Sequence, residues 1–211
     1  MKKKIILFVI LEKYADWEGA YLSSALSMLG QGVYESKTVS MTKEAVSSIG
    51  GFHALPDYDI YSVPDDYEAL ILIGGMSWRT EAAQQVKPLV EKCFEAGRVL
   101  GGICDASAFL GTTGVLNQVK HTSNDLEDMK AWAGEVYTGE EYYRREQAVA
   151  DGNIVTANGT AALEFAREVL LALKAAPEEK IMEWYSFHKL GLCSAAMPED
   201  ATSWDVEAAG K

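Results

Sequence analysis

Cys104 is the residue whose surroundings in the sequence most favour chemistry. It follows the apolar run Val99–Ile103, which contains the pair Gly101-Gly102, and it precedes the small residues of a helix expected from Asp105. This strand, turn and helix order is that of a nucleophile elbow, although the G-x-S-x-G spelling is absent. A thiol there would face the crevice at the carboxyl ends of the strands, and the helix N-terminus would favour its thiolate. Cysteine can also be a small core residue, so the layout alone leaves both interpretations open.

A second glycine pair, Gly74-Gly75, ends the apolar run Ala69–Ile73. Glycine allows backbone N–H groups to come close to a bound oxyanion, although any tight turn also favours this pair. The order along the chain adds weight, because a first strand, this glycine pair and the turn at Cys104 follow one another. We therefore expect the backbone N–H groups of Gly74, Gly75 and Asp105 to hold an oxyanion that forms at Cys104.

The elements that must position these residues alternate between apolar runs and helical patterns. Unbroken Val/Ile/Leu runs are typical of buried parallel strands, so we predict an α/β fold: a doubly wound, mostly parallel sheet, flavodoxin-like, with helices on both faces. The segment 37–64 contains glycine and proline turn signals and is interpreted as a β-hairpin or excursion at the sheet edge. The expected strands are 5–11, 69–73, 99–103 and 153–157, and the expected helices are 16–29, 81–96, one from 105, one from 159 and 178–190.

Length and charge limit the domain organisation and the function classes. The 211 residues are within reach of one large α/β domain, so we predict a single domain over 1–211, with 177–211 as a C-terminal helical extension. A net charge of −12 argues against nucleic acid and anionic lipid as partners, because both reward clusters of Lys and Arg. No apolar run approaches the length of a membrane span, and charged residues follow the segment 5–11 at once, so we interpret that segment as a buried strand rather than a signal peptide. A small-molecule substrate is the expected partner, with no nucleic acid and no membrane.

The cysteines and histidines argue against a disulfide framework and a metal site. The three cysteines form no CxxC pair and no even-numbered set, which is typical of a protein in the reducing cytoplasm. Cys93 lies in register with the apolar residues of its expected helix and is interpreted as core. The three histidines are scattered, without an HExxH motif or a cluster at metal-ligand spacing. We expect a cytoplasmic protein with no metal and no cofactor.

Several stretches, taken in their order along the chain, resemble the ThiJ/PfpI superfamily. They are 71–75, 102–104 with the helix after it, 114–116, and 153–159 followed by 164–166. The superfamily is related in fold to class I glutamine amidotransferases. Its members include small-molecule hydratases, glyoxalase-like and deglycase-like enzymes, reported proteases, chaperones and oxidative-stress proteins. The resemblance therefore implies a fold and a reactive cysteine at Cys104, but it does not fix the reaction.

The resemblance also implies a carboxylate that partners the cysteine, placed just after the first strand. Two residues compete for this role. Glu18 continues the apolar helical face formed by Leu22, Leu26 and Leu29, so spacing points its carboxyl group inward. Asp16 has another explanation as the helix N-cap, yet its spacing to the following glycine fits a branch that resembles isocyanide hydratase. We favour Glu18 and keep Asp16 as the alternative.

The sequence departs from the superfamily pattern where a histidine base would stand. One branch has a histidine directly after the cysteine, and that residue here is Asp105. Another branch has one after the glycine of the segment 114–116, and ungapped counting there leads to Asn124. His121 lies three residues earlier and would enter the site only if the loop is rearranged. Without a histidine base, protease and amidotransferase activities lose weight, because such hydrolysis needs a base that activates the thiol and an acid that protonates the leaving amine.

These residues lead to one main function and one rival. We expect a cysteine-dependent enzyme of small electrophiles, a hydrolase, hydratase or glyoxalase-like protein, with a candidate catalytic set of Cys104, Glu18 or Asp16, and His121. The rival is a non-enzymatic oxidative-stress or chaperone-like protein whose cysteine is redox-sensitive. The resemblance and the expected hairpin both suggest a homodimer.

Overall fold

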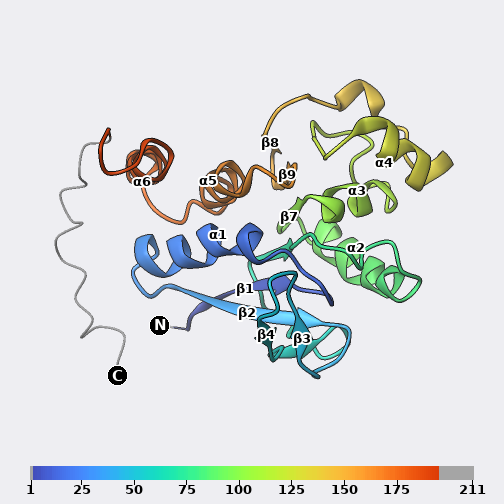
Figure 1. Cartoon of the computed structure of the whole chain (residues 1–211), viewed down its shortest axis with the longest axis horizontal. Helices are drawn as coiled ribbons and strands as arrows, with labels where there is room; N and C mark the ends of the chain where they lie inside the picture. The colour runs from blue at the N-terminus through green and yellow to red at the C-terminus, as the bar shows by residue number, and fades with distance from the viewer. Residues whose placement is uncertain (1, 195–211) are drawn as a thin grey trace.

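The computed structural model describes residues 2–194, and within this range seven strands form one sheet (Figure 1). The strands are β1 (Lys4–Val9), β2 (Tyr34–Ser40), β5 (Tyr58–Asp59), β6 (Ala69–Leu72), β7 (Val99–Ile103), β8 (Ala148–Asp151) and β9 (Ile154–Ala157). Their order in the sheet is β5-β2-β1-β6-β7-β9-β8. The neighbouring pairs from β5 to β9 in this order are parallel, and β8 pairs with β9 in the antiparallel sense. The structure thus confirms the predicted doubly wound, mostly parallel α/β fold.

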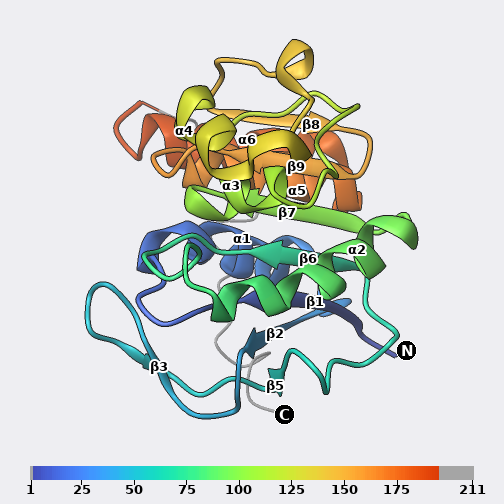
Figure 2. The same ribbon diagram turned by 90° about the vertical axis from the view of Figure 1, so that its right-hand side faces the viewer.

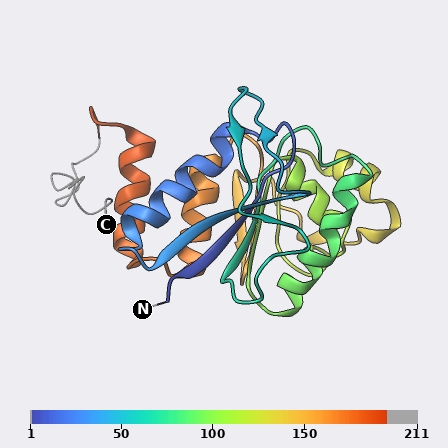
Figure 3. The ribbon, with the colours of Figure 1, turned by 90° about the horizontal axis from the view of Figure 1, so that it is seen from below.

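Helices cover both faces of the sheet, and Figure 3 shows the sheet between the two layers. The helices are α1 (Asp16–Leu29), α2 (Lys87–Glu95), α3 (Asp105–Gly111), α4 (Leu126–Ala133), α5 (Ala162–Leu173) and α6 (Glu178–Leu190), with the 3₁₀ turns η1 (Ala82–Val86), η2 (Gly134–Val136) and η3 (Glu140–Tyr142). Apolar residues of β1 alternate between the faces: Leu7 and Val9 pack with α2, α3 and α4, whereas Ile6 and Phe8 pack with α1, α5 and α6. Cys93 is completely buried on α2, as predicted for a core residue.

The segment that follows β2 leaves the main sheet before β5 joins its edge. Strands β3 (Val46–Ser47) and β4 (His53–Ala54) pair in the antiparallel sense and form a small sheet of their own, the excursion predicted at the edge (Figure 2). Helix α6 lies in the first part of the predicted C-terminal extension, and residues 195–211 of that extension lie outside the described part of the chain. Within residues 2–194, no helix combines the length and the apolar character needed to cross a membrane.

The central strands place three segments at one edge of the sheet. Val9 of β1 pairs with Leu72 of β6, and Leu72 pairs with Gly102 of β7. The chain continues from these neighbouring carboxyl ends into α1, the Gly74-Gly75 turn and α3. In open α/β sheets this edge is where ligands bind.

Candidate active site

Cys104 occupies the turn between β7 and α3 in a conformation that L-residues rarely adopt. Its φ of 60° and ψ of −132° fit no regular element. The backbone is held there because its N–H donates to the Ala157 carbonyl at 3.0 Å and its carbonyl accepts from the Ser107 hydroxyl at 2.6 Å. A strained residue of this kind costs about 1–3 kcal/mol and persists only where the surroundings enforce it. The half-buried thiol therefore sits on a nucleophile elbow.

Glu18, on the first turns of α1, is 0% exposed and lies against this elbow. Its Oε2 accepts a hydrogen bond from the Gly74 N–H at 2.7 Å. Its Oε1 is buried without an N–H or O–H donor, and the Cys104 thiol is the neighbouring polar group. Only glycine fits at position 74, because a Cβ there would lie 2.5 Å from the Cys104 Cβ and 2.6 Å from Glu18 Oε2. The structure thus brings together the two residues that the sequence placed first.

The carboxyl and the thiol titrate as a pair. Burial raises the pKa of Glu18 to about 7, against weaker lowering by hydrogen bonds from Cys104 and Gly74. Burial also raises the pKa of the Cys104 thiol, and the Glu18 charge raises it further, while the Asn124 amide and the Asp105 N–H oppose this. Each group disfavours ionisation of the other, so near neutral pH the pair tends to share one proton.

Asp16, the alternative partner, has its hydrogen bonds elsewhere. The N-cap of α1 is Ala15, so the other explanation of Asp16, as the cap of this helix, is wrong. Its Oδ2 accepts from the Gly50 N–H at 2.8 Å, and a hydrogen bond from Ser48 lowers its pKa. Asp16 therefore ties α1 to the β3–β4 segment as an ordinary carboxylate.

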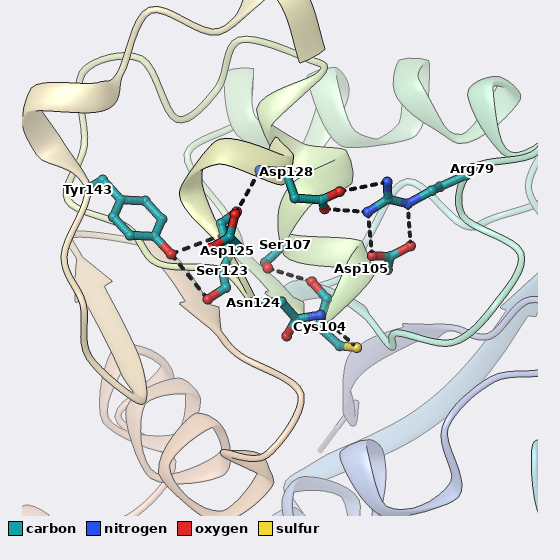
Figure 4. A network of polar contacts seen from close by, with 9 residues as sticks. All are labelled: Arg79, Cys104, Asp105, Ser107, Ser123, Asn124, Asp125, Asp128 and Tyr143. Atoms are coloured by element: carbon teal, nitrogen blue, oxygen red, sulfur yellow. Dashed lines mark hydrogen bonds and ion pairs between the residues drawn. The ribbon is translucent and has the colours of Figure 1, made fainter. Parts of the chain in front are cut away.

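Asn124, rather than His121, reaches the sulfur. Its Nδ2 donates to Cys104 Sγ at 3.3 Å (Figure 4), and its Oδ1 accepts from the Gly159 N–H at 2.8 Å. An amide donor stabilises a thiolate, but it cannot exchange a proton as a histidine does. Ungapped counting from the segment 114–116 had led to this position.

His121 is completely buried at a distance from that chemistry. Its Nδ1 lies 2.7 Å from the Val119 carbonyl and its Nε2 lies 2.6 Å from the Tyr137 hydroxyl. The ring also packs edge-on against Tyr137 and Tyr143, and burial lowers its pKa. Both nitrogens are engaged by these neighbours, so the geometry does not support the expectation that His121 could serve as the base.

The expected oxyanion donors differ in their availability. The Gly74 N–H donates to Glu18, so it is not available to an oxyanion, contrary to the expectation for Gly74. Gly75 has a φ of 142°, and a Cβ there would lie 2.3 Å from the Lys13 carbonyl oxygen, so glycine is required. Within residues 2–194 the Gly75 N–H has no backbone acceptor. The Asp105 N–H lowers the pKa of the Cys104 thiol, so it acts on the reacting atom itself.

Arg79 is the residue of this region that the sequence reasoning missed. Two of its nitrogens bind the carboxylate of Asp105, directly after the nucleophile, and it also binds Asp128 on α4. Asp105 and Asp128 are far from Arg79 in sequence, and no motif marks the contact. The carboxylate of Asp105 thus forms an ion pair with Arg79 and does not contact the thiol.

A cleft of about 540 Å³ opens beside Asn124, between the segment before α4, the segment before β8 and the segment after β9. Its lining is mostly polar, so a ligand there would be held by hydrogen bonds and charges more than by apolar contacts. The lining residues are Thr122, Ser123, Asn124, Asp125, Leu126, Tyr143, Arg145, Glu146, Gln147, Asn158 and Thr160. In the described part of the chain, no group of His, Cys, Asp and Glu side chains is arranged to hold a metal ion.

These features define a class: α/β proteins with a cysteine at a strained nucleophile elbow, backed by a buried carboxyl group. The chain belongs to the DJ-1/PfpI family, whose model matches residues 3–172. This confirms the resemblance drawn from the sequence motifs.

Relatives of similar length support the assignment. "Uncharacterized protease YdeA" of Bacillus subtilis (strain 168) is 37% identical over 191 residues, which cover 90% of this chain and 93% of that protein. "Uncharacterized protease YoaZ" of the same organism is 34% identical over 196 residues, covering 89% and 91%. The structure of the thiJ/pfpI family protein from Bacillus anthracis matches with a TM-score of 0.83 and 32% identity over 90% of this chain and 92% of the other. DJ-1 superfamily protein Atu0886 from Agrobacterium tumefaciens matches with a TM-score of 0.80 and 36% identity, over 89% and 98%.

Proposed function

We propose that the protein is a cysteine-dependent enzyme of small electrophiles, in which Cys104 adds to a carbonyl-like carbon and Glu18 handles the proton. The observation that carries the proposal is the buried pair: a thiol on a strained turn beside a carboxyl whose pKa burial raises to about 7. Catalytic acids need such a pKa, near the working pH, which an exposed carboxyl lacks. The polar cleft beside Asn124 supports a small substrate.

The proposed first step follows from the shared proton. The proton of the Cys104 thiol passes to the Glu18 carboxylate as Sγ attacks the electrophilic carbon, a C–S bond forms, and the C=O π electrons move to oxygen. Glu18, as the neutral acid, gives its proton to that oxygen and becomes a carboxylate, so that a hemithioacetal results. The Gly75 N–H is the free backbone donor suited to hold the developing charge.

We propose further that peptides are poor substrates, although two relatives carry the word protease in their names. Expelling an amine requires a positioned acid that protonates it, which in Cys/His enzymes is an imidazolium. Asn124 contacts the sulfur where a histidine would serve, and an amide has no proton to give. General acid–base catalysis of this kind contributes roughly 10²–10⁴-fold, enough to separate the two reactions.

A substrate comparison tests the proposal. Purified protein is incubated with aldehydes, α-oxoaldehydes, isonitriles and casein, beside Cys104→Ser as the control. We expect turnover of at least one small compound, lost in Cys104→Ser, and no Cys104-dependent cleavage of casein. Casein cleavage that disappears in both Cys104→Ser and His121→Ala but survives in Asn124→Ala would overturn the proposal and make His121 the base.

A second candidate is a redox-responsive, chaperone-like protein. Glu18 Oε1 faces the sulfur without another donor, so the neutral acid could donate to an oxygen placed on the oxidised sulfur. Peroxide titration with mass mapping separates the candidates: stable, stoichiometric oxidation of Cys104 without turnover of any small compound favours the redox function.

A further inference from the structure

Arg79 lies at the centre of a charged network that begins at the residue after Cys104 (Figure 4). Its Nε and Nη2 donate to the two carboxylate oxygens of Asp105 at 2.9 and 3.0 Å. Its Nη1 and Nη2 donate to Asp128 on α4 at 3.1 and 2.5 Å. The guanidinium also lies over Trp132, with Cζ 4.8 Å from the ring centroid. One planar group thus holds two carboxylates that come from different elements.

Asp105 is a charge that works against the thiolate unless it is compensated. It is the first residue of α3, adjacent to the nucleophile, and its charge contributes to raising the pKa of Glu18. A carboxylate near a thiol disfavours the thiolate in the same way. The Asp105 side chain is only 21% exposed, so water screens it little. In Figure 4 its carboxylate points toward Arg79 and not toward the Cys104 sulfur.

We propose that Arg79 is a positioning residue for the Cys104 thiol: it holds the Asp105 carboxylate away from the sulfur, neutralises it, and ties it to α4. The inference rests on the proposed role of Cys104 as the reactive thiol. The ion pair with Asp128 also links Arg79 to Asn124, the residue that donates to the sulfur. The Asp128 N–H donates to Asp125 at 2.9 Å, and Asp125 is the residue directly after Asn124.

Asn124 and the Gly74 and Gly159 backbones bring no charge to the sulfur, so the ionisable groups near it are acidic. Glu18 lies against the sulfur from α1. Asp105, the first residue of α3, has its backbone N–H near the sulfur and its carboxylate turned toward Arg79. Arg79 is the cation that binds one of them, so its removal should make ionisation of the thiol less favourable.

The test is the pH dependence of Cys104 alkylation by iodoacetamide, followed by mass mapping of the Cys104 peptide in folded protein. We expect Arg79→Met to raise the midpoint of the Cys104 titration by roughly 0.5–1 pH unit, because the negative charge of Asp105 would then act on the sulfur without compensation. Arg79→Lys keeps the charge without the planar fork, so it should recover at least half of that shift. Asp128→Asn leaves the Asp105 pair in place and should shift the midpoint less than Arg79→Met.

Two further variants separate this role from general stabilisation. Arg167 pairs with Glu168 and lies 4.6 Å over the Tyr185 ring, so Arg167→Met removes a comparable arginine away from the elbow and should leave the midpoint unchanged. In an Asp105→Asn background, Arg79→Met should have no effect, because the charge it compensates is gone.

Each contrary result has a separate meaning. An unchanged midpoint in folded Arg79→Met, or an equal shift with and without Asp105→Asn, overturns the inference and leaves the proposed function standing. If Cys104→Ser keeps the turnover of the small compound, the proposed function fails instead.

Discussion

Glu18 and His121 are both completely buried, yet their surroundings satisfy them to different degrees. The His121 ring has a partner at each nitrogen, and its backbone bridges to Tyr143 as an extended segment. Glu18 has a backbone donor at one oxygen, while the other oxygen faces a thiol on a strained turn. Buried polar groups are normally fully hydrogen-bonded, and exceptions cluster with backbone strain at functional sites.

Burial of a titratable side chain therefore does not by itself indicate function. Burial lowers the pKa of His121 and keeps the ring neutral, so it behaves as a structural hydrogen-bonding group. Burial raises the pKa of Glu18 into the range where it can give and take a proton at neutral pH. Burial of His121 therefore costs the folded state little free energy, whereas burial of the Glu18 carboxyl destabilises the folded state at neutral pH.

The largest difference between the two regions should appear in turnover. Cys104→Ser should lower the turnover of a small electrophile by roughly 10³-fold or more, because removal of a nucleophile leaves only binding and oxyanion contacts. His121→Phe, compared in the same assay, should stay within about threefold of the unmodified protein, because its hydrogen bonds do not reach the sulfur. If folded His121→Phe loses as much turnover as Cys104→Ser, then His121 takes part in catalysis and is not only a structural residue.

The two carboxylates of α1 allow a second contrast within the site. Glu18→Gln keeps the acceptor for Gly74 but removes the proton, so turnover should fall roughly 10²–10³-fold. Asp16→Asn should change turnover less than about threefold, since Asp16 bonds to Gly50 rather than to the site. Of these two variants, only Glu18→Gln should alter the pH titration of Cys104 alkylation. A change seen only in Asp16→Asn would mean that Asp16, and not Glu18, is the partner of the thiol.

Local patterns made much of this arrangement predictable from the sequence. Helix α1 has the bounds expected for it, 16–29, and Glu18 is buried on the same face as Leu22 and Leu26 because helical spacing fixes that face. The turn at Cys104 also follows from local residues, since glycines must crowd between an apolar strand and a helix. The parallel order of the strands followed from their alternation with helices.

The remaining features depend on contacts between segments that no local pattern specifies. Whether His121 or Asn124 reaches the sulfur depends on the path of a loop whose residues pair with Tyr143 and Gly159. Arg79 meets Asp105 only because the turns after β6 and β7 lie side by side. Asp16 likewise finds its partner in the excursion after β2, so spacing alone could not distinguish it from an N-cap.

The contrast should also appear in the free energy of unfolding. The pKa of Glu18 rises from its ordinary 4.5 to about 7 on folding, so between these values the folded protein keeps a proton that the unfolded chain releases. Stability must therefore fall as pH rises through this window, and Glu18→Gln, which does not titrate, should be more stable than the unmodified protein above pH 7 by about 1–3 kcal/mol. Near pH 4 this difference should vanish. At neutral pH His121→Phe should instead lose about 1–3 kcal/mol, because Tyr137 and Val119 lose a buried partner.

Urea titrations at several pH values measure these differences. A Glu18→Gln curve parallel to that of the unmodified protein from pH 4 to 8 would mean that folding does not raise the pKa of the carboxyl, which would then be ionised at neutral pH and have no proton to give. A His121→Phe variant of unchanged stability would mean that its ring hydrogen bonds contribute nothing net, contrary to their role as a satisfied structural pair.

The smallest expected effect concerns Asn124, the amide that stands at the sulfur. Its Nδ2 bond to Cys104 at 3.3 Å favours the thiolate, so Asn124→Ala should raise the pH midpoint of Cys104 alkylation slightly and lower the rate at neutral pH by about two- to tenfold, the worth of one hydrogen bond. Asn124→Asp is the sharper variant, because it keeps the size but replaces the donor with a second negative charge near Glu18. That change should raise the midpoint more than alanine does, since like charge adds to the lost hydrogen bond. If alanine and aspartate give the same midpoint as the unmodified protein, the Asn124 contact does not act on the thiol. The thiol would then depend on Glu18, Asp105 and the strained turn alone.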